Sequence, residues 1–459
     1  MKKIDDVEIT VIGAGIVGIA TAYYLCKKYQ RRSVLLIDAR DPMSYTSAQS
    51  GDNYRNWWPS TVMTQFTNHS IELMQEIARE SSNILQMKQR GYALATRRKN
   101  IDDLLETLES NYKSSDGLVR VHSNSYSSTY AAPNNDDWAS AVDGVDVVSN
   151  RELIKSAFPA FSSQIENVLH VRRAGNFSSQ QMGNYMLEQV KPLGCRRMRG
   201  HVENIVKDGC YTLELSTQDG NVSLKADIVV NAAGPYVGEV AKMLGAELPV
   251  KNVFHQKVAF EDTLQAVPRN QPFSIDLDET SLDWEDEERA ALSEDPSLSW
   301  LTKPIEGGIH CRPEGTGRWI KLGWAYNRNS SEPNNDQNLI EDPAYDASFP
   351  EVVIRGAARL NPNLSPYIEK LPSGRVHYGG YYTMTKENWP LVGPLGDDGS
   401  FVVGALSGFG CMGACAAGSL SADWICSGDL PEYAGALSLS RYDDPILMDE
   451  MLRTNVGLL

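Results

Sequence analysis

Three glycines near the start of the chain have the spacing of a dinucleotide-binding turn. Gly13, Gly15 and Gly18 directly follow an apolar, β-rich run at residues 7–12 and open a helical pattern of small and apolar residues. In this context the first glycine permits a tight turn, the second lets the backbone approach a pyrophosphate, and the third lets the helix pack closely on the strand. Free amides and the dipole at the helix N-terminus would favour the negative phosphates.

A second apolar run, residues 34–38, ends in Asp38, which is placed to accept hydrogen bonds from ribose hydroxyls. Arg40 close by would instead suit a 2′-phosphate. This order of elements predicts a Rossmann-like domain but does not distinguish NAD from FAD. The chain continues into an irregular aromatic segment, residues 46–60, and a long helix predicted to reach about Gln89. This irregular continuation is unlike that of a nicotinamide dehydrogenase, which usually continues with regular strand–helix alternation.

Another glycine-rich turn lies near the opposite end of the chain. Residues 401–406 predict a strand, residues 407–410 a turn, and Cys411 begins a helix of small residues. Small residues let such a helix lie close to a flat ligand, and its positive end would stabilise the charge that a flavin gains on reduction. The alternative is a small-residue helix that packs tightly against a sheet without any ligand.

Three polar side chains in apolar surroundings are candidates for chemistry. Lys321 lies in an alternating apolar segment, where a lysine is costly unless it is paired or functional. Arg55, in an aromatic cluster with Trp57, has a guanidinium that matches a carboxylate or could contact a flavin. His255 lies in a predicted strand and titrates in the range of acid–base chemistry. A solvent-facing lysine, an aromatic interdomain plug and a core histidine are the structural alternatives.

Four segments spread over the chain carry a family likeness. They are GAGIVG with LLID, SGDNYRN, IVVNAAGPYVGEVAKMLG, and the most specific, GGYYTMTKENWPLVGPLGDDGSFVVGALSGFGCMGACAAG. Together they resemble the D-amino-acid oxidase and monomeric sarcosine oxidase superfamily of FAD-dependent amine oxidoreductases.

The resemblance implies FAD as cofactor and roles for individual residues. Lys321 matches a lysine over the flavin that assists reduction of dioxygen. Gly380 stands where some members attach FAD through a cysteine, so non-covalent FAD is expected. Met412 stands where sarcosine oxidases grip the substrate carboxylate with a lysine, which implies a larger or differently anchored substrate, or a carboxylate held by another group such as Arg55.

The candidate residues form three sets. The expected cofactor contacts are Gly13, Gly15, Ile16, Val17, Gly18, Asp38, Ala39, Arg40, Ser50, Gly51, Asp52, Arg55, Val202, Ala233, Gly234, Gly408, Phe409, Gly410, Cys411 and Met412. The expected substrate contacts are Arg55, Trp57, Tyr381, Tyr382 and Met412. The expected catalytic residues are Lys321, Arg55 and His255.

Composition narrows the function classes. The 459 residues carry a formal net charge of −16, which argues against a nucleic-acid partner. Seven scattered cysteines favour a reducing compartment over a disulfide scaffold, and no metal site is expected. The uncharged residues 9–25 resemble a signal peptide only superficially, because Asp5, Asp6 and Glu8 precede them and glycines interrupt them. The uncharged residues 400–422 contain too many glycines for a membrane span. We therefore expect a cytoplasmic protein, either a monomer or a homodimer.

The resemblance implies an α/β architecture, a mixture of α and β in which a Rossmann-like FAD-binding domain interleaves with a substrate domain on a mixed, mostly antiparallel sheet. The expected FAD-binding segments are residues 1–85, 150–235 and 356–459. The expected substrate-domain segments are residues 86–149 and 236–355. The acidic run at residues 282–297 predicts a solvated helix inserted in the substrate domain.

The expected activity is oxidation of the C–N bond of an amine or N-substituted amino acid to an imine by hydride transfer to FAD, with dioxygen as acceptor. One alternative is a D-amino-acid or 2-hydroxy-acid dehydrogenase that passes electrons to a carrier and uses His255 as base. A flavoprotein that serves assembly, with vestigial catalysis, is a second alternative. A nicotinamide enzyme is the most distant one.

Overall fold

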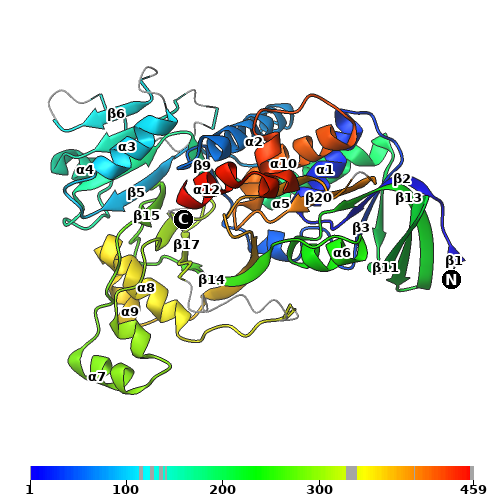
Figure 1. The fold of residues 1–459 in the computed structure, drawn as a ribbon. Coiled ribbons are helices and arrows are strands. Elements are labelled where there is room, and N and C mark those ends of the chain that lie inside the picture. The colour runs from blue at the N-terminus through cyan, green and yellow to red at the C-terminus, as the bar shows by residue number, and fades with distance from the viewer. Residues whose placement is uncertain are drawn as a thin grey trace.

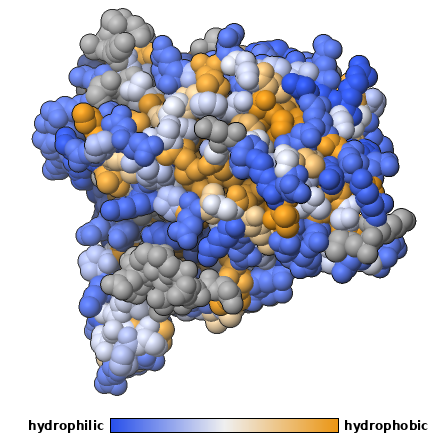
Figure 2. Space-filling model, turned by 45° about the vertical axis from the view of Figure 1, so that its right-hand side comes forward, coloured by the Kyte–Doolittle hydropathy of each residue, from blue (hydrophilic) through white to orange (hydrophobic). Residues whose placement is uncertain are grey.

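In the computed structural model, two nine-stranded sheets organise the chain (Figure 1). The structure describes residues 2–112, 117–124, 129–133, 138–139, 142–326, 339–396 and 398–454. Hydrophilic residues cover most of the face seen in Figure 2, and hydrophobic residues gather toward its middle.

The first sheet is the Rossmann-like part of the molecule. Its strands follow the order β10-β3-β2-β13-β12-β11, and β20 runs parallel to β13. The central strands β10, β3, β2 and β13 are parallel, and the apolar β2 is buried between two neighbours, as its sequence predicts. The strands are β1 (Lys2–Lys3), β2 (Val7–Ile12), β3 (Val34–Asp38), β10 (Cys195–Arg199), β11 (His201–Asp208), β12 (Cys210–Thr217), β13 (Gly220–Asn231), β19 (Leu391–Pro394) and β20 (Ser400–Gly404).

A layer of helices contacts this sheet, and its packing depends on small residues. A Cβ on Gly418 of α10 would lie 2.6 Å from the backbone carbon of Ala20 in α1, so the two helices are in close contact there. On another side of α10, the Ser70 hydroxyl of α2 donates to the Met412 carbonyl. The helices of this layer are α1 (Ile16–Lys27), α2 (Thr61–Glu80), α5 (Ser179–Val190) and α10 (Gly410–Ile425).

The second sheet follows the order β18-β14-β17-β16-β15-β5-β8-β7-β6 and is mixed but mostly antiparallel. The strands are β5 (Tyr92–Thr96), β6 (Val119–His122), β7 (Val145–Val148), β8 (Asn167–Val171), β14 (Lys251–Glu261), β15 (Phe273–Asp276), β16 (His310–Pro313), β17 (Trp319–Gly323) and β18 (Val376–Met384). A short ribbon of β4 (Asn53–Arg55) and β9 (Ala174–Asn176) forms a third, two-stranded sheet.

The remaining helices lie around these sheets. The exposed helix α7 stands at the tip of the lower lobe in Figure 1 and confirms the solvated helix expected from the acidic run. These helices are α3 (Asp102–Asn111), α4 (Arg151–Ala157), α6 (Val237–Met243), α7 (Asp286–Glu294), α8 (Phe349–Leu360), α9 (Pro366–Glu369), α11 (Ala434–Leu437) and α12 (Pro445–Thr454).

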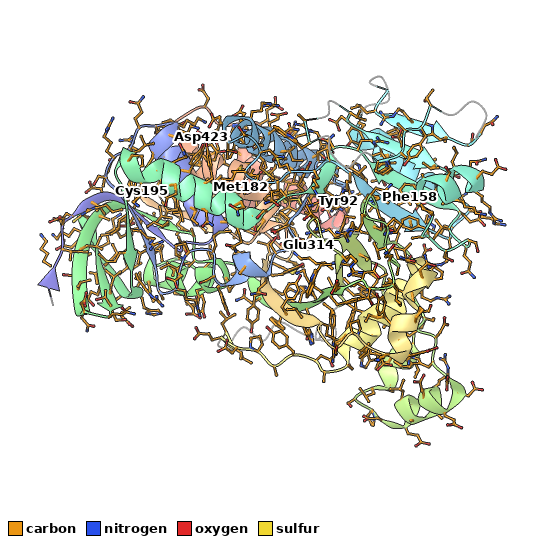
Figure 3. The ribbon with its side chains drawn as sticks, turned by 180° about the vertical axis from the view of Figure 1, so that it is seen from behind. Tyr92, Phe158, Met182, Cys195, Glu314 and Asp423 are labelled. Carbon is orange, nitrogen blue, oxygen red and sulfur yellow. The ribbon has the colours of Figure 1, made fainter. Side chains whose placement is uncertain are left out.

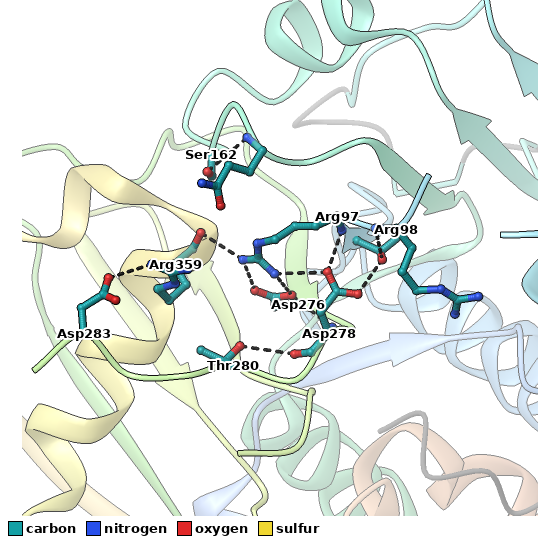
Figure 4. A network of polar contacts seen from close by, with 10 residues as sticks. Arg97, Arg98, Ser162, Asp276, Asp278, Thr280, Asp283 and Arg359 are labelled. Carbon is teal, nitrogen blue, oxygen red and sulfur yellow. Dashed lines mark hydrogen bonds and ion pairs between the residues drawn. The ribbon is translucent and has the colours of Figure 1, made fainter. Parts of the chain in front are cut away.

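A polar network joins α8 to the middle of the second sheet (Figure 4). The guanidinium of Arg97, just after β5, contacts the carboxylates of Asp276 at 2.7 Å and Asp278 at 3.2 Å. The same guanidinium donates to the carbonyl of Arg359 in α8 at 3.1 Å. Because Asp276 is fully buried, the loss of Arg97 would leave a buried charge without its partner.

The expected fold class is confirmed, while the division into domains stays a prediction. Two strands, β8 and β18, fall inside segments expected to belong to the FAD-binding domain but pair within the second sheet. A boundary drawn by sheet membership would therefore lie at other residues. The helix expected to reach about Gln89 ends at Glu80, because Ser82 and Asn83 adopt the left-handed backbone region with φ of 54° and 59°.

Substitution Gly418→Ala is expected to lower the free energy of unfolding, because the new methyl group would meet the backbone of Ala20 rather than a movable side chain. Overpacking of this kind costs about 1–3 kcal/mol, against a gain in helix propensity of about 1 kcal/mol. Urea denaturation measures the change. Gly435→Ala is the matched control, since a Cβ there meets nothing within 4 Å. Equal effects of the two substitutions would contradict the close helix contact.

Candidate active site

The N-terminal turn has no room for side chains at two of its three glycines. Gly13 adopts a φ of +109°, and a Cβ there would lie 2.3 Å from the Ala232 carbonyl oxygen. A Cβ on Gly18 would lie 2.0 Å from the Gly13 carbonyl oxygen. These are the tight turn and the close helix–strand contact that a dinucleotide-binding turn requires.

The backbone amides at the start of α1 are held by two side chains. The Ile16 amide donates to the Ser47 hydroxyl at 3.0 Å, and the Ala14 amide donates to the Asp38 carboxylate at 2.7 Å. Asp38 also accepts from the amide of Arg40 at 2.8 Å. Asp38 therefore lies beside the turn, where the sequence places it, whereas Ser47 was not among the expected residues.

The side chain of Arg40 is engaged by protein groups. Its guanidinium carbon lies 4.2 Å from the centroid of the Tyr45 ring, and it forms an ion pair with Glu341. It also donates to the Tyr236 hydroxyl at 3.2 Å. These contacts account for Arg40 without a 2′-phosphate.

Several buried polar atoms near this turn and under the second sheet have no hydrogen-bond partner in the described part of the chain. They are Thr46 Oγ1, Asp52 Oδ1, Asn53 Oδ1 and the Tyr378 hydroxyl. Buried polar atoms in proteins are nearly always satisfied by protein, water or ligand. Gly234, expected to contact the cofactor, has a φ of +57° and open space where a Cβ would stand. The segment is thus suited to a polar ligand such as the dinucleotide.

The late glycine turn contacts the second sheet. Gly408 has a φ of +86°, and a Cβ there would lie 2.2 Å from the Tyr382 ring. Phe409 packs edge-on against Trp58, with ring centroids 4.9 Å apart, and α10 begins at the next residue. Burial raises the pKa of Cys411, the second residue of α10, to about 12, so its thiol is protonated at neutral pH.

The register of the second sheet places several candidates on one face, which we call the roof. Directly opposed residues of antiparallel strands share a face. His255 is opposite Gly380, Lys257 is opposite both Tyr378 and Gly323, and Lys321 is opposite Ala259 and Arg312. The alternate residues Val258 and Phe260 pack into the apolar core that contains α8.

The same alternation separates two neighbouring tyrosines. Tyr382 is opposite Val253 and therefore shares the roof face, whereas Tyr381 is opposite Phe254 on the other face. Tyr381 packs against Phe254 and donates its hydroxyl to the Ile340 carbonyl at 2.8 Å. Tyr381 and Tyr382 therefore do not line the same space.

One carboxylate joins two cations of the roof. Glu314 Oε2 lies 3.0 Å from Lys321 Nζ and 2.7 Å from Arg312 Nη2. Burial opposes its ionisation, but the charges of Arg312 and Lys321 prevail and lower the pKa of Glu314. Arg312 also donates to the Gly51 carbonyl at 2.7 Å, which ties the roof to the loop after the first nucleotide segment. Figure 3 shows Glu314 and Tyr92 in the middle of the molecule.

Arg55 is a buried cation without a carboxylate partner among the described residues. It is 2% exposed, and its Nε and Nη1 atoms have no hydrogen-bond partner there. Its guanidinium carbon lies 4.1 Å from the Trp58 ring centroid and 5.8 Å from that of Tyr92. Burial lowers the pKa of Arg55 to about 10, so it is still charged at neutral pH.

Two roof histidines are neutral at neutral pH. Burial, assisted by the nearby charge of Lys257, lowers the pKa of His255 to about 3. Burial also lowers the pKa of His310 to about 4, with Lys257 and Arg312 adding to the effect. A base of such low pKa is a weak proton acceptor at neutral pH.

Three other expected residues lie in apolar surroundings. Trp57 is 1% exposed and packs with Tyr92 in one core cluster. Val202 packs among the apolar side chains of the first sheet, and Met412 belongs to the core cluster that contains residues of α1, α2 and α10. Sequence reasoning missed Ser47, Arg312, Glu314 and Lys257. The alternation that identified His255 could have pointed to Lys257, two residues further along the same strand.

The chain belongs to the FAD dependent oxidoreductase family, whose model matches residues 8–424. The protein is therefore an FAD-dependent oxidoreductase, and the expected family and cofactor are confirmed. Human mitochondrial dimethylglycine dehydrogenase is 22% identical over 449 residues, which are 95% of this chain and 44% of that protein. This chain thus spans less than half the length of that relative.

Solved structures share the fold. L-proline dehydrogenase from P. horikoshii superposes with a TM-score of 0.69 at 18% identity. The match covers 96% of this chain and 99% of the dehydrogenase chain. Glycine oxidase from Geobacillus kaustophilus gives a TM-score of 0.67 at 16% identity and covers 95% of this chain and 99% of its own.

Neither a membrane-spanning helix nor a metal-binding cluster occurs among the described residues. No described helix combines the length and the apolar character needed to cross a bilayer. No three His, Cys, Asp or Glu side chains among the described residues gather closely enough to hold a metal ion.

The low pKa of His255 predicts how stability depends on pH. Below about pH 6.5 the unfolded chain takes up a proton at this residue that the folded protein does not bind until about pH 3. Stability therefore falls as pH falls through this window, by up to about 1.4 kcal/mol per pH unit. Urea denaturation at pH 6.5 and 4.5 should show a smaller loss for His255→Gln than for the wild type. Exposed His201→Gln is the control, and identical slopes for all three proteins would refute the buried neutral imidazole.

Proposed function

We propose that this protein oxidises the C–N bond of a small amine or amino acid that carries a carboxylate. The observation that carries this proposal is Arg55, a fully charged, buried guanidinium with two unpartnered nitrogens and no carboxylate partner among the described residues. A buried charge of this kind is strongly unfavourable unless an anion pairs with it. The guanidinium fork matches a carboxylate in two parallel hydrogen bonds.

The relatives support the substrate class. Their names include a dimethylglycine dehydrogenase, a proline dehydrogenase and a glycine oxidase, all of which are named for amino acids. Because function lives in sites rather than folds, we use these names as support for an amino-acid-like substrate and not for a particular one.

The residues of the site orient a substrate rather than move its protons. Arg55 would hold the carboxylate, and the rings of Trp58 and Tyr92 beside it would exclude water. FAD, when bound, supplies the hydride acceptor. The substrate nitrogen must be neutral so that its electron pair assists departure of the hydride, and the neutral His255 adds no opposing charge. The imine product would then hydrolyse, or cyclise if it carries a second nucleophile.

The cofactor would be held without a covalent bond. Gly380, at the position where some family members carry a linking cysteine, has no side chain, and a Cβ there would already lie 3.0 Å from Gln49 Cβ. FAD would be bound by the glycine turn at Gly13 and the carboxylate of Asp38, in the N-terminal part of the sequence, and by the glycine turn at Gly408, in the C-terminal part.

A 2-hydroxy-acid dehydrogenase is less well supported. Oxidation of a hydroxyl requires a base, and His255 has a pKa of only about 3. Anaerobic mixing with a panel of amines, amino acids and 2-hydroxy acids separates these functions. Bleaching of the flavin by carboxylated amines alone is the expected result, and bleaching by hydroxy acids alone would refute the proposal. No bleaching by any small substrate would favour a role in assembly.

Substitution Arg55→Met is expected to lower kcat/KM for a carboxylated amine by about 10²–10⁴-fold, because breaking a buried ion pair costs about 3–5 kcal/mol and every 1.4 kcal/mol is about tenfold. The same amine without its carboxylate should react equally with both proteins. The kcat/KM of Arg55→Lys, which keeps the charge but not the planar fork, should lie between that of the wild type and that of Arg55→Met. Steady-state kinetics are compared at equal FAD content. Equal losses for the two amines would assign Arg55 to the flavin instead.

We further propose dioxygen as the electron acceptor, with Lys321 stabilising the negative charge that forms on oxygen. Lys321→Met should slow reoxidation of the reduced protein by dioxygen far more than it slows reduction by substrate. Stopped-flow measurement of the two half-reactions tests this directly. An equal loss in both would remove the assignment, and a wild type that reoxidises only with an added electron carrier would identify a dehydrogenase.

A further inference from the structure

A second lysine of the roof is buried more deeply than Lys321. Lys257, on β14, is 7% exposed and lies opposite Tyr378 on one side and Gly323 on the other. It therefore faces the same space as His255 and Lys321. Nothing in the expected catalytic or binding machinery accounts for it.

The ammonium of Lys257 is poorly satisfied by the protein. It donates to the Gln49 carbonyl at 3.4 Å and lies 5.4 Å from the centroid of the Tyr382 ring. Among the described residues no carboxylate pairs with it, whereas Lys321 is paired with Glu314 at 3.0 Å. An ammonium has three donors and is costly to bury without an anion, so Lys257 is suited to an anionic ligand.

The atoms around Lys257 belong to the segments that surround the flavin in the proposed site. Gln49 directly precedes the Ser50–Asp52 loop, and the Tyr382 ring lies against Gly408 of the late glycine turn. The charge of Lys257 also reaches the first turn of α10, because it opposes the rise in the pKa of Cys411 that burial causes. Lys257 thus lies close both to the segment that contains Gln49 and to the late glycine turn.

Among the described residues, no titratable group near Lys257 forms an ion pair with it. His255 and His310, which feel the charge of Lys257, are themselves neutral at neutral pH. Asp52 also acts on Cys411 but forms no ion pair with Lys257. The positive charge is therefore available to a ligand.

We propose that Lys257 is the cation that meets the flavin ring of FAD and stabilises the negative charge the ring gains on reduction, which raises the reduction potential of the cofactor. A fixed positive charge in a dry site acts strongly on charge that develops close to it. This role rests on FAD binding alone, so it holds whichever amine is the substrate.

The test uses the FAD-loaded protein and needs no substrate. Lys257→Met should lower the equilibrium constant for reduction of the bound flavin at least about tenfold, which lowers its reduction potential by about 30 mV for a two-electron couple. Spectroelectrochemical titration measures this potential. Sulfite, which adds to the flavin ring and leaves a negative charge there, should bind at least about tenfold more weakly. Lys257→Arg, which keeps the charge, should restore most of both properties.

Two further variants keep the test decisive. Lys257→Gln should shift both quantities in the same direction as Lys257→Met, and sulfite titration with added FAD allows measurement even if a variant holds its cofactor less tightly. Lys251→Met removes an exposed lysine from the same strand and should change neither quantity. An unchanged potential and unchanged sulfite affinity in both neutral variants would overturn the proposal. That result would assign Lys257 to a second anionic group of the substrate, and it would leave the C–N oxidation untouched.

Discussion

Positive charge that is buried without matching negative charge is the constraint on which this site depends. Arg55 and Lys257 are both more than nine-tenths buried, and neither pairs with a carboxylate in the described residues. In an acidic protein of net charge −16, carboxylates to neutralise them are plentiful in the sequence. Their isolation is the observation behind both proposals, in which ligands supply the anions, a substrate carboxylate at Arg55 and the reduced flavin at Lys257.

Two features of the fold keep these cations apart from carboxylates. The β4–β9 ribbon carries Arg55 into an aromatic enclosure rather than to the surface. The register of β14 against β17 and β18 fixes Lys257 on the roof face, while the opposite face of β14 is occupied by an apolar core. A shift of one residue in either pairing would move Lys257 into that core, so the strand register itself specifies the charge of the site.

The sequence was sufficient for the turns and for the fold class, because both depend on local steric requirements. Gly13 and Gly18 have no room for a side chain, and the apolar runs of β2 and β3 form buried parallel strands. The pairs that connect distant segments could not be predicted. Ser47 reaches the amide of Ile16, Arg312 reaches the Gly51 carbonyl, and Glu314 neutralises Lys321. No spacing or composition in the amino-acid sequence signals any of these contacts. Tyr381 and Tyr382 were both expected to contact the substrate, and strand alternation places them on opposite faces.

The comparison of Lys321 with Lys257 bears on the choice of electron acceptor. Relatives of the same fold are named both as oxidases and as dehydrogenases, so the fold does not decide whether dioxygen or a carrier removes the electrons. Glu314 is shared by Lys321 and Arg312, so the three groups together keep a net positive charge, and the ion pair holds Lys321 in a fixed place. Lys257, which has no carboxylate partner among the described residues, is the lysine proposed to act on the flavin. Taken together, the two proposals assign the tuning of the flavin to Lys257 and the handling of the acceptor to the Glu314–Lys321 pair. Under these proposals, changes confined to that pair would alter the acceptor and leave the cofactor potential unchanged.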